Sequence, residues 1–344
     1  MKETITARID RITSLQPEQR SPTPPVPRSV KIELTAHCDF QCFFCASAMR
    51  LRRKSDMSWK FYTRAVKELR ELGVEELGVF YLGESFICEW LADAISYAKR
   101  ECAYPYVFLT TNGRMASPER VRECMAAGLD SLKFSFNFSD PRQFHEVTRV
   151  KASEYHTVLA NLKAARRVRD EVLAETGHRC GIYASSILYD GEQRDRMREA
   201  VAEILPYVDE HYWLPLYGQA GLTAGARGTR PTAGNQGRIG ELRKPLPCWS
   251  LFTEGHITYD GRLAACCFDH AGRFKLFQAA RFRAGRLRER RHVRTADFAQ
   301  DPFDFRNGID AHGLCHVGAG LHEQLAARDR GIDTTIPFTV DADG

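Results

Sequence analysis

The chain lacks the long apolar segments that would bring it to a membrane. No run approaches the ~18 consecutive apolar residues of a spanning helix, and the opening MKETITAR has no apolar core of the kind that a secretory signal requires. A strong charge of one sign is also missing, because the formal net charge is only +5 over 344 residues. Composition therefore predicts a cytoplasmic protein with neither a membrane nor a nucleic acid as its partner.

Cysteine, by contrast, is abundant, with eleven residues in the chain. Disulfides are rare in a reducing compartment, so this excess indicates metal or redox chemistry. Cys38, Cys42 and Cys45 lie in one short loop with the spacing C-x3-C-x2-C. Thiolates are the soft ligands of iron–sulfur clusters, and three of them leave one iron of a four-iron cluster open for chemistry. Buried thiols are the interpretation for the cysteines at 88, 102, 124 and 180.

Strand-like and helix-like segments alternate along the first two thirds of the chain. The strand-like segments are rich in β-branched and aromatic residues and span 30–35, 77–82, 106–111, 131–137, 181–189 and 211–216. The helix-like segments between them span 58–72, 89–101, 117–127, 153–175 and 192–204. Six such units predict an α/β fold, a partial (β/α)6 TIM-like barrel that stays open. Chemistry in such sheets lies at the carboxyl ends of the strands, and the cysteine loop directly follows the first strand.

The cysteine loop, with the aromatic Phe44 before its third cysteine, resembles that of the radical S-adenosylmethionine (SAM) enzymes. The resemblance implies a [4Fe–4S] cluster whose open iron chelates the amino and carboxylate groups of SAM. It further implies reductive cleavage of SAM to a 5′-deoxyadenosyl radical that abstracts hydrogen from a substrate. An electron donor such as flavodoxin or ferredoxin follows from the same resemblance.

Further motifs of the core resemble the SAM-binding positions of that family. The run Tyr81–Ser85 keeps Gly83 and Glu84 of a Gly-Gly-Glu-Pro motif that contacts the SAM amino group, but departs from it at Leu82 and Ser85. A carboxylate there suits an ammonium ligand. The remaining positions with polar side chains that the resemblance assigns to SAM are Thr111, Asn112, Ser135, Asn137, Arg149 and Ser185.

A second cysteine group begins at Cys248 and continues to Cys266 as C-x12-G-x4-C. Asp260 and Gly261 between two short alternating runs predict a β-hairpin that brings these cysteines together. The pattern resembles the SPASM and twitch domains, which implies a second, auxiliary [4Fe–4S] cluster with Cys315 as a further ligand. The fourth ligand stays open between Cys267, His312, His316, a substrate and no ligand at all.

The sequence thus divides into five segments. We expect an extended, proline-rich lead-in over 1–29, the barrel core over 30–217 and a glycine-rich connection over 218–247. A small twitch-type domain of β-hairpin and helix is expected over 248–320, followed by a tail over 321–344. The basic stretch 273–294 is interpreted as a solvated face or part of an irregular tail.

The auxiliary cluster favours oxidation, because it can accept the electron of a substrate radical. The leading hypothesis is therefore dehydrogenation of a secondary alcohol on a carbohydrate or aminocyclitol, as in the similar dehydrogenases of antibiotic biosynthesis. Redox-neutral chemistry on a sugar or nucleotide sugar (dehydration, epimerisation or decarboxylation) is the first alternative. Peptide modification is the second, and the ~30 residues before the core, without a strand pattern for leader recognition, weigh against it. Weak candidates for a catalytic base lie near strand ends and are Glu33, His145, Asp190 and Tyr217.

Overall fold

A single curved sheet of eight strands organises the computed structural model, which describes residues 4–14, 25–45, 47, 53–216, 253–264 and 267. The strand order is β6-β5-β4-β3-β2-β1-β7-β8. The strands are β1 (Ser29–Ile32), β2 (Glu76–Gly78), β3 (Tyr106–Thr111), β4 (Ser131–Ser135), β5 (Gly181–Ile187), β6 (Glu210–Leu214), β7 (Glu254–Ile257) and β8 (Leu263–Ala264). The first six pair in chain order and in parallel, which confirms the predicted open α/β sheet.

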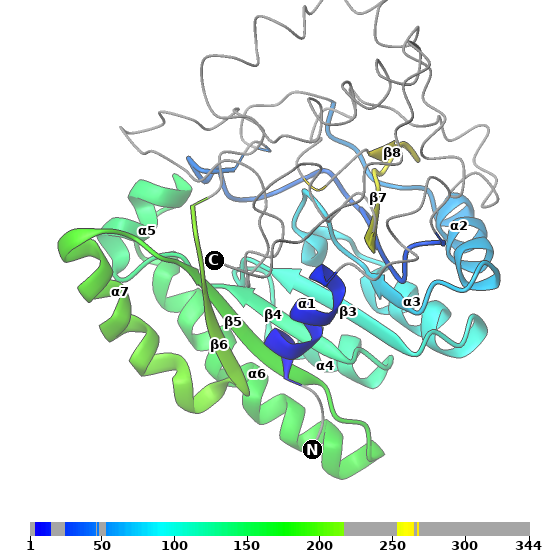
Figure 1. Ribbon diagram of the computed structural model, residues 1–344. Helices are drawn as coiled ribbons and strands as arrows, with labels where there is room; N and C mark the ends of the chain where they lie inside the picture. Colours follow the sequence, from blue (N-terminus) through cyan, green and yellow to red (C-terminus); the bar gives the residue numbers. More distant parts are fainter. Residues whose placement is uncertain are drawn as a thin grey trace, which may run out of the picture.

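Helices connect the parallel strands, as the alternating pattern predicts (Figure 1). They are α2 (Trp59–Glu71), α3 (Leu91–Ser96), α4 (Pro118–Ala126), α5 (Pro141–Thr148), α6 (Glu154–Thr176) and α7 (Gly191–Ile204), with the π-helical turn η4 (Tyr97–Glu101) and the 3-10 turns η3 (Ser85–Ile87) and η5 (Leu205–Tyr207). Ser58 and Ser117 cap α2 and α4 by accepting backbone N–H bonds, which explains where these two helices begin. None of the helices in the described ranges has the length and apolar character needed to cross a membrane.

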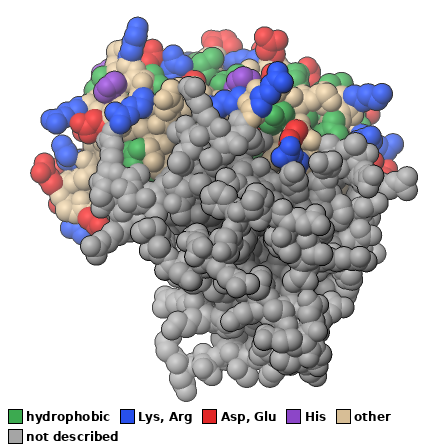
Figure 2. Space-filling view, turned by 90° about the horizontal axis from the view of Figure 1, so that it is seen from above, with side chains coloured by type: hydrophobic (Ala, Val, Ile, Leu, Met, Phe, Trp, Pro, Cys, Tyr) green, Lys and Arg blue, Asp and Glu red, His purple; other side chains and the backbone are tan. Residues whose placement is uncertain are grey.

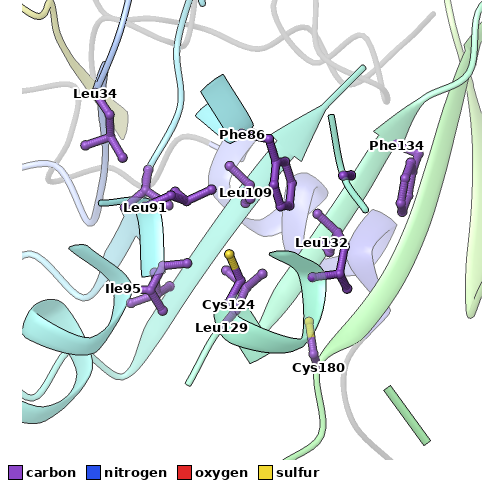
Figure 3. Close-up of a cluster of buried hydrophobic side chains, with 14 of the residues drawn as sticks. Leu34, Phe86, Leu91, Ile95, Leu109, Cys124, Leu129, Leu132, Phe134 and Cys180 are labelled. Atoms are coloured by element: carbon purple, nitrogen blue, oxygen red, sulfur yellow. The ribbon is translucent and has the colours of Figure 1, made fainter. Parts of the chain in front are cut away.

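The main core lies between the outer face of the sheet and these helices. Leu109 of β3 and Leu132 of β4 gather there with Cys124 and Leu129 from and after α4 (Figure 3). Cys88, Cys124 and Cys180 are buried in this core, as the sequence predicts, whereas Cys102 is only partly buried. Burial on one face of each strand leaves the alternate residues on the inner face.

The first helix corrects the expectation of an extended lead-in over 1–29, because Ile5–Thr13 forms α1. Thr4 caps it by accepting from the backbone N–H of Ala7, and its side chains then find partners on the sheet. Thr6 donates to Glu210 of β6, while Arg8 binds Glu76 of β2 at 2.7 Å. Since β2 and β6 do not pair, α1 bridges the inner side of the curved sheet near the amino ends of the strands.

A second short helix, α5, was not expected between the fourth and fifth strands. Its start is explained locally, since Asp140 accepts from the backbone N–H of Gln143 at 2.8 Å and Pro141 occupies the first turn. The helix ends at Arg149, which adopts a left-handed conformation with φ 64°. The last turn of α5 lies beside the cysteine loop, so this unpredicted helix helps to position the site.

The predicted β-hairpin is confirmed, with β7 and β8 antiparallel and Gly261 at φ 75° in the turn. The hairpin also joins the core, because β7 pairs in parallel with β1 over Ser29–Ile32. Several predicted features fall outside the described residues: Tyr217, Cys248, Cys266, His312, Cys315, His316, the connection 218–247, the basic stretch 273–294 and the tail 321–344. On the face shown in Figure 2, acidic and basic side chains intermingle over the described surface.

Candidate active site

The three-cysteine loop leaves the carboxyl end of β1 and lies against the last turn of α5. Gln41 donates its backbone N–H to the carbonyl of Thr148 at 2.8 Å, and Phe43 donates to that of Val147 at 3.2 Å. Inside the loop, Cys45 donates its N–H to the Cys42 carbonyl at 2.9 Å. These backbone bonds hold the loop at the edge of the sheet where parallel α/β proteins carry their chemistry.

All three cysteines of the loop are partly buried. Burial raises the pKa of Cys38 to about 12, and Glu84, Asp39 and Cys45 add to the shift. Burial likewise raises the pKa of Cys42 well above its ordinary value, with Cys45 and Cys38 contributing. The thiols therefore lie close enough to influence one another.

The side chains of the cysteine loop suit a metal cluster better than a single metal ion. Across the described ranges, no set of three His, Cys, Asp or Glu side chains has the arrangement of a single-ion site. Three mutually interacting thiols from one loop are instead the donor set of a multi-iron cluster, and iron binding displaces the thiol protons. The residues present fit a cluster held by thiolates.

Glu84, which follows β2, is hydrogen-bonded to residues at the carboxyl end of β3. Its side chain is only 3% exposed and accepts three hydrogen bonds. Thr111 Oγ1 donates to Oε1 at 2.8 Å, the N–H of Phe86 donates to Oε1 at 3.1 Å, and the N–H of Asn112 donates to Oε2 at 2.7 Å. Burial raises the pKa of Glu84 to about 7 despite these bonds, and the nearby carboxylate of Asp39 contributes to the rise.

Gly83 allows the β2 exit to pass directly over the backbone that leads into the cysteine loop. A Cβ atom at this position would lie 2.1 Å from the carbonyl oxygen of Thr35 and 2.7 Å from that of His37. The neighbouring Glu84 N–H donates to the same His37 carbonyl at 2.8 Å. Only glycine permits so close an approach, which gives Gly83 a packing role.

Asp39, within the cysteine loop, is a site residue that the sequence analysis missed. Asn112 Nδ2 donates to its Oδ1 at 2.7 Å, and Arg114 Nη1 binds its Oδ2 at 3.1 Å. Arg114 also binds Glu154 through Nε at 3.1 Å, so the network reaches α6. The signal in the sequence was an acid between two of the cysteines and an arginine just after the Thr-Asn-Gly turn. Asp39 thereby fastens the loop to the end of β3.

The other expected SAM positions spread along the ends of β4 and β5. Asn137 accepts from the backbone N–H of Ile187 at 3.0 Å, so its side chain joins the two strand ends. Ser135 and Ser185 are register partners on β4 and β5, and Ser185 is buried. Arg149 is exposed at the end of α5, beside the carbonyls that hold the loop. Phe44 lies in the loop with its ring centroid 5.2 Å from that of Phe43.

The weak candidates for a catalytic base lie in different settings. Glu33 is fully buried and accepts from the backbone N–H of Tyr259 at 3.0 Å, which fastens the β7–β8 hairpin. His145 is exposed, with Nδ1 2.7 Å from the carbonyl of Val150. Asp190 precedes α7 and forms no side-chain cap there. The structure therefore gives Glu33 a structural partner and does not single out His145 or Asp190 as a base.

Part of the chain is similar in sequence to a known enzyme. At 32% identity over 143 residues, the chain matches the PqqA peptide cyclase of Streptomyces rochei. That match covers 41% of this chain and 37% of the relative, little more than a third of that protein's length.

Solved structures share the fold at low sequence identity. SuiB of Streptococcus suis bound to its precursor peptide SuiA aligns with a TM-score of 0.54 and 13% identity, over 77% of this chain and 63% of that one. The structure of anSMEcpe with bound AdoMet aligns with a TM-score of 0.50 and 10% identity, over 75% and 80% of the two chains. The model of the radical SAM superfamily matches residues 32–204, half of the chain, and this range runs from the last residue of β1 through the cysteine loop to the end of α7. The protein therefore belongs to the radical SAM superfamily.

Proposed function

We propose that Cys38, Cys42 and Cys45 hold the [4Fe–4S] cluster that the family uses, and that SAM binds beside them over the ends of β3, β4 and β5. The observation that carries this proposal is the set of three interacting thiols in one loop at the carboxyl edge of the sheet. The chemistry that a bound cluster and SAM supply there is reductive cleavage of SAM, which yields the radical that abstracts hydrogen from the substrate. A flavodoxin- or ferredoxin-like donor is the proposed source of the electron.

The chain's own residues position the two groups in this proposal. Glu84 uses both carboxylate oxygens inside the protein, yet among the described residues Oε2 accepts a hydrogen bond only from Asn112, which leaves a lone pair for the SAM amino group. Asn112 and Asp39 hold the loop against β3, so the thiols and Glu84 keep a fixed relation. The remaining residues proposed to line the SAM site are Phe44, Gly83, Thr111, Ser135, Asn137, Arg149 and Ser185.

For the reaction, our first proposal is oxidation of a secondary alcohol on a carbohydrate or aminocyclitol. It rests on the cysteine pattern of an auxiliary cluster, with Cys248, Cys266 and Cys315 as ligands and Cys267 or His312 as the fourth. Of these residues only Cys267 lies in the described part of the chain, where it is partly buried beyond β8. Such a cluster would accept the electron that net oxidation releases.

Peptide modification is the second candidate, and the comparisons favour it. The PqqA peptide cyclase resembles this chain at 32% identity over 143 residues. SuiB, whose structure contains a precursor peptide, adds likeness of fold. These two similarities support a peptide substrate, and neither depends on the cysteine pattern of the auxiliary cluster.

Replacing each of Cys38, Cys42 and Cys45 by alanine tests the cluster assignment. We expect each variant, reconstituted without oxygen, to lose 5′-deoxyadenosine formation from SAM by at least ~1,000-fold, because two thiolates do not hold the cluster. Chromatography of the products with reductant present measures the rate. Cys102→Ala is the control, since it removes a partly buried thiol away from the loop and should leave the rate within about twofold. SAM cleavage that persists in the loop variants contradicts the proposal.

Two probes separate the substrate classes. An aminocyclitol such as 2-deoxy-scyllo-inosamine and a PqqA-type precursor peptide are added separately to the reduced enzyme, and 5′-deoxyadenosine is counted against product. Stimulation by the aminocyclitol, with one SAM consumed per ketone formed and no net reductant, supports alcohol oxidation. Stimulation by the peptide alone overturns it in favour of peptide modification. About four rather than eight irons per chain argues against the auxiliary cluster.

A further inference from the structure

Lys133 lies on the inner face of the barrel, where a charged side chain is costly. It is the third residue of β4, and its neighbours Leu132 and Phe134 are buried in the outer core (Figure 3). Because side chains alternate along a strand, Ser131, Lys133 and Ser135 face the opposite side. That side is the concave face of the curved sheet.

Side chains from distant strands converge on Lys133. Its Nζ lies 5.8 Å from the centroid of the Tyr212 ring on β6. Lys31 of β1 is close enough to act electrostatically on both Lys133 and Tyr212. Since β1 and β6 lie at opposite sides of the six-stranded core and do not pair, only the interior of the barrel can bring these three side chains together.

The charge of Lys31 is compensated, whereas that of Lys133 has no counter-ion among the described residues. Lys31 forms an ion pair with Glu254 on β7, and the same carboxylate lies 3.5 Å from His256 Nε2. In the part of the chain that the structure describes, no carboxylate pairs with Lys133. Burial lowers the pKa of Lys133 to about 8, and Lys31 lowers it further in the same direction. Lys133 is partly buried, and a desolvated ammonium without an anion among the described residues is destabilising, so an anionic ligand would gain both attraction and relief of that cost.

The position of Lys133 relates this ammonium to the SAM site. Ser135, two residues further on the same face, lies at the carboxyl end of β4 among the residues proposed to line that site. Two residues of a strand rise ~7 Å, which the four-carbon stem of a lysine can span. A ligand held by Lys133 would therefore lie inside the barrel next to SAM.

We propose that Lys133 binds an anionic group of the substrate, a carboxylate or a phosphate, inside the barrel. The inference rests on the proposed function, because it takes the barrel interior beside SAM as the substrate site. Both candidate substrate classes can carry such a group: a peptide offers acidic side chains, and a sugar offers an acid or a phosphate ester. The substrate class is thereby narrowed to anionic molecules, which favours an acidic or phosphorylated carbohydrate, or an acidic peptide, over an unmodified aminocyclitol.

The test uses inorganic phosphate and acetate as probes on the reconstituted, SAM-bound protein. Thermal unfolding is followed while each anion replaces chloride at constant ionic strength, for the unsubstituted protein, Lys133→Met, Lys133→Gln and Lys163→Met. Lys163, on α6 and paired with Glu203, is the control for the loss of a lysine elsewhere. We expect at least one anion to raise the midpoint by several degrees in the unsubstituted protein and in Lys163→Met, and the rise to vanish in both Lys133 variants.

An equal rise in the Lys133 variants, or no rise in the unsubstituted protein, overturns the proposal. A rise of the midpoint with phosphate but not with acetate indicates a phosphorylated substrate. A rise with acetate but not with phosphate indicates a substrate with a carboxylate. SAM itself carries a carboxylate, so its Kd is measured in parallel; a Kd tenfold weaker in Lys133→Met assigns Lys133 to SAM and also overturns the proposal. Formation of 5′-deoxyadenosine by the unsubstituted protein is a separate readout, because its absence contradicts the proposed function without altering the anion result.

Discussion

Buried charges have different partners at the two edges of the sheet, the amino edge formed by the amino ends of the parallel strands and the carboxyl edge formed by their carboxyl ends. At the amino edge, Asp209 accepts from Arg169 at 3.0 Å and Arg179 at 2.8 Å, and Glu76 is paired with Arg8. Toward the carboxyl edge, Glu84 is buried with hydrogen bonds but with no cation partner among the described residues.

The difference separates stability from function. Charges whose partners are all inside the protein hold the strands together, and removing one partner leaves the other buried and unpaired. Buried charges that lack a counter-ion are instead places where a bound group can complete the balance. In α/β barrels these two roles fall on opposite ends of the strands. Three predictions, ordered from the largest expected effect to the smallest, test this contrast.

Asp209→Ala should destabilise the fold most. Arg169 is only 2% exposed and would lose one of its two carboxylate partners, keeping only the exposed Asp170, while the backbone N–H of Ile182 would lose its acceptor. We expect the free energy of unfolding to fall by about 3 kcal/mol, as measured by urea denaturation. Asp195→Ala on the exposed face of α7 is the control and should change it by less than about 0.5 kcal/mol. A loss below about 1 kcal/mol for Asp209→Ala would show that the amino edge does not carry the stability we assign to it.

Asp39→Ala should act on the reaction more than on the fold. Without its carboxylate the cysteine loop loses Asn112 and Arg114 as anchors, so we expect SAM cleavage to slow by roughly 10- to 100-fold, about 1.4–2.7 kcal/mol of activation free energy. The urea midpoint should move less than in Asp209→Ala.

Glu154→Ala is the matched control for Asp39→Ala. It removes the other partner of Arg114 and leaves the Asp39 contacts in place. Its rate of SAM cleavage should stay within about twofold of that of the unsubstituted protein. An equal loss of rate in both variants would indicate that Arg114, rather than the anchoring of the loop, is responsible.

His211, on β6 between the two edges, gives the smallest effect and one that depends on pH. Burial lowers its pKa to about 4, below the ordinary value of 6.5. Ser186 Oγ donates to the carbonyl of Phe136 and therefore accepts from His211 Nε2 at 3.0 Å. Because the folded protein holds His211 in its neutral form, the burial and hydrogen bonding of this ring stabilise the fold fully above pH 6.5. This stabilisation is lost as the pH falls toward 4, since the unfolded chain then binds a proton that the folded protein does not.

The free energy of unfolding should decline less between pH 6.5 and pH 4 in His211→Asn than in the unsubstituted protein. We expect the two declines to differ by roughly 1–2 kcal/mol at pH 4. Urea denaturation of both proteins across this pH range measures their free energies of unfolding. The titration of the carboxylates that both proteins share cancels when one curve is subtracted from the other. Parallel curves for the two proteins would contradict the shifted pKa.

Local patterns anticipated the repeating part of the fold. The third strand, Tyr106–Thr111, has the bounds expected from its run of β-branched and aromatic residues, and the hairpin turn follows from Asp260 and Gly261. Helix α1 was missed because its partners, Glu76 and Glu210, are ~70 and ~200 residues away in sequence. The pairing of β7 with β1 is equally non-local.

For the candidate site, the sequence by itself determined the chemistry of the ligands: three thiols at a spacing that suits a cluster, and Glu84 at the end of the second strand. These follow from residue type and local order. Only the tertiary structure decided that Asp39 fastens the cysteine loop to Asn112 and that Lys133 shares the barrel interior with side chains of β1 and β6. Whether a charge is compensated depends on which strands the curved sheet brings together, and that information lies in packing between residues far apart in the chain.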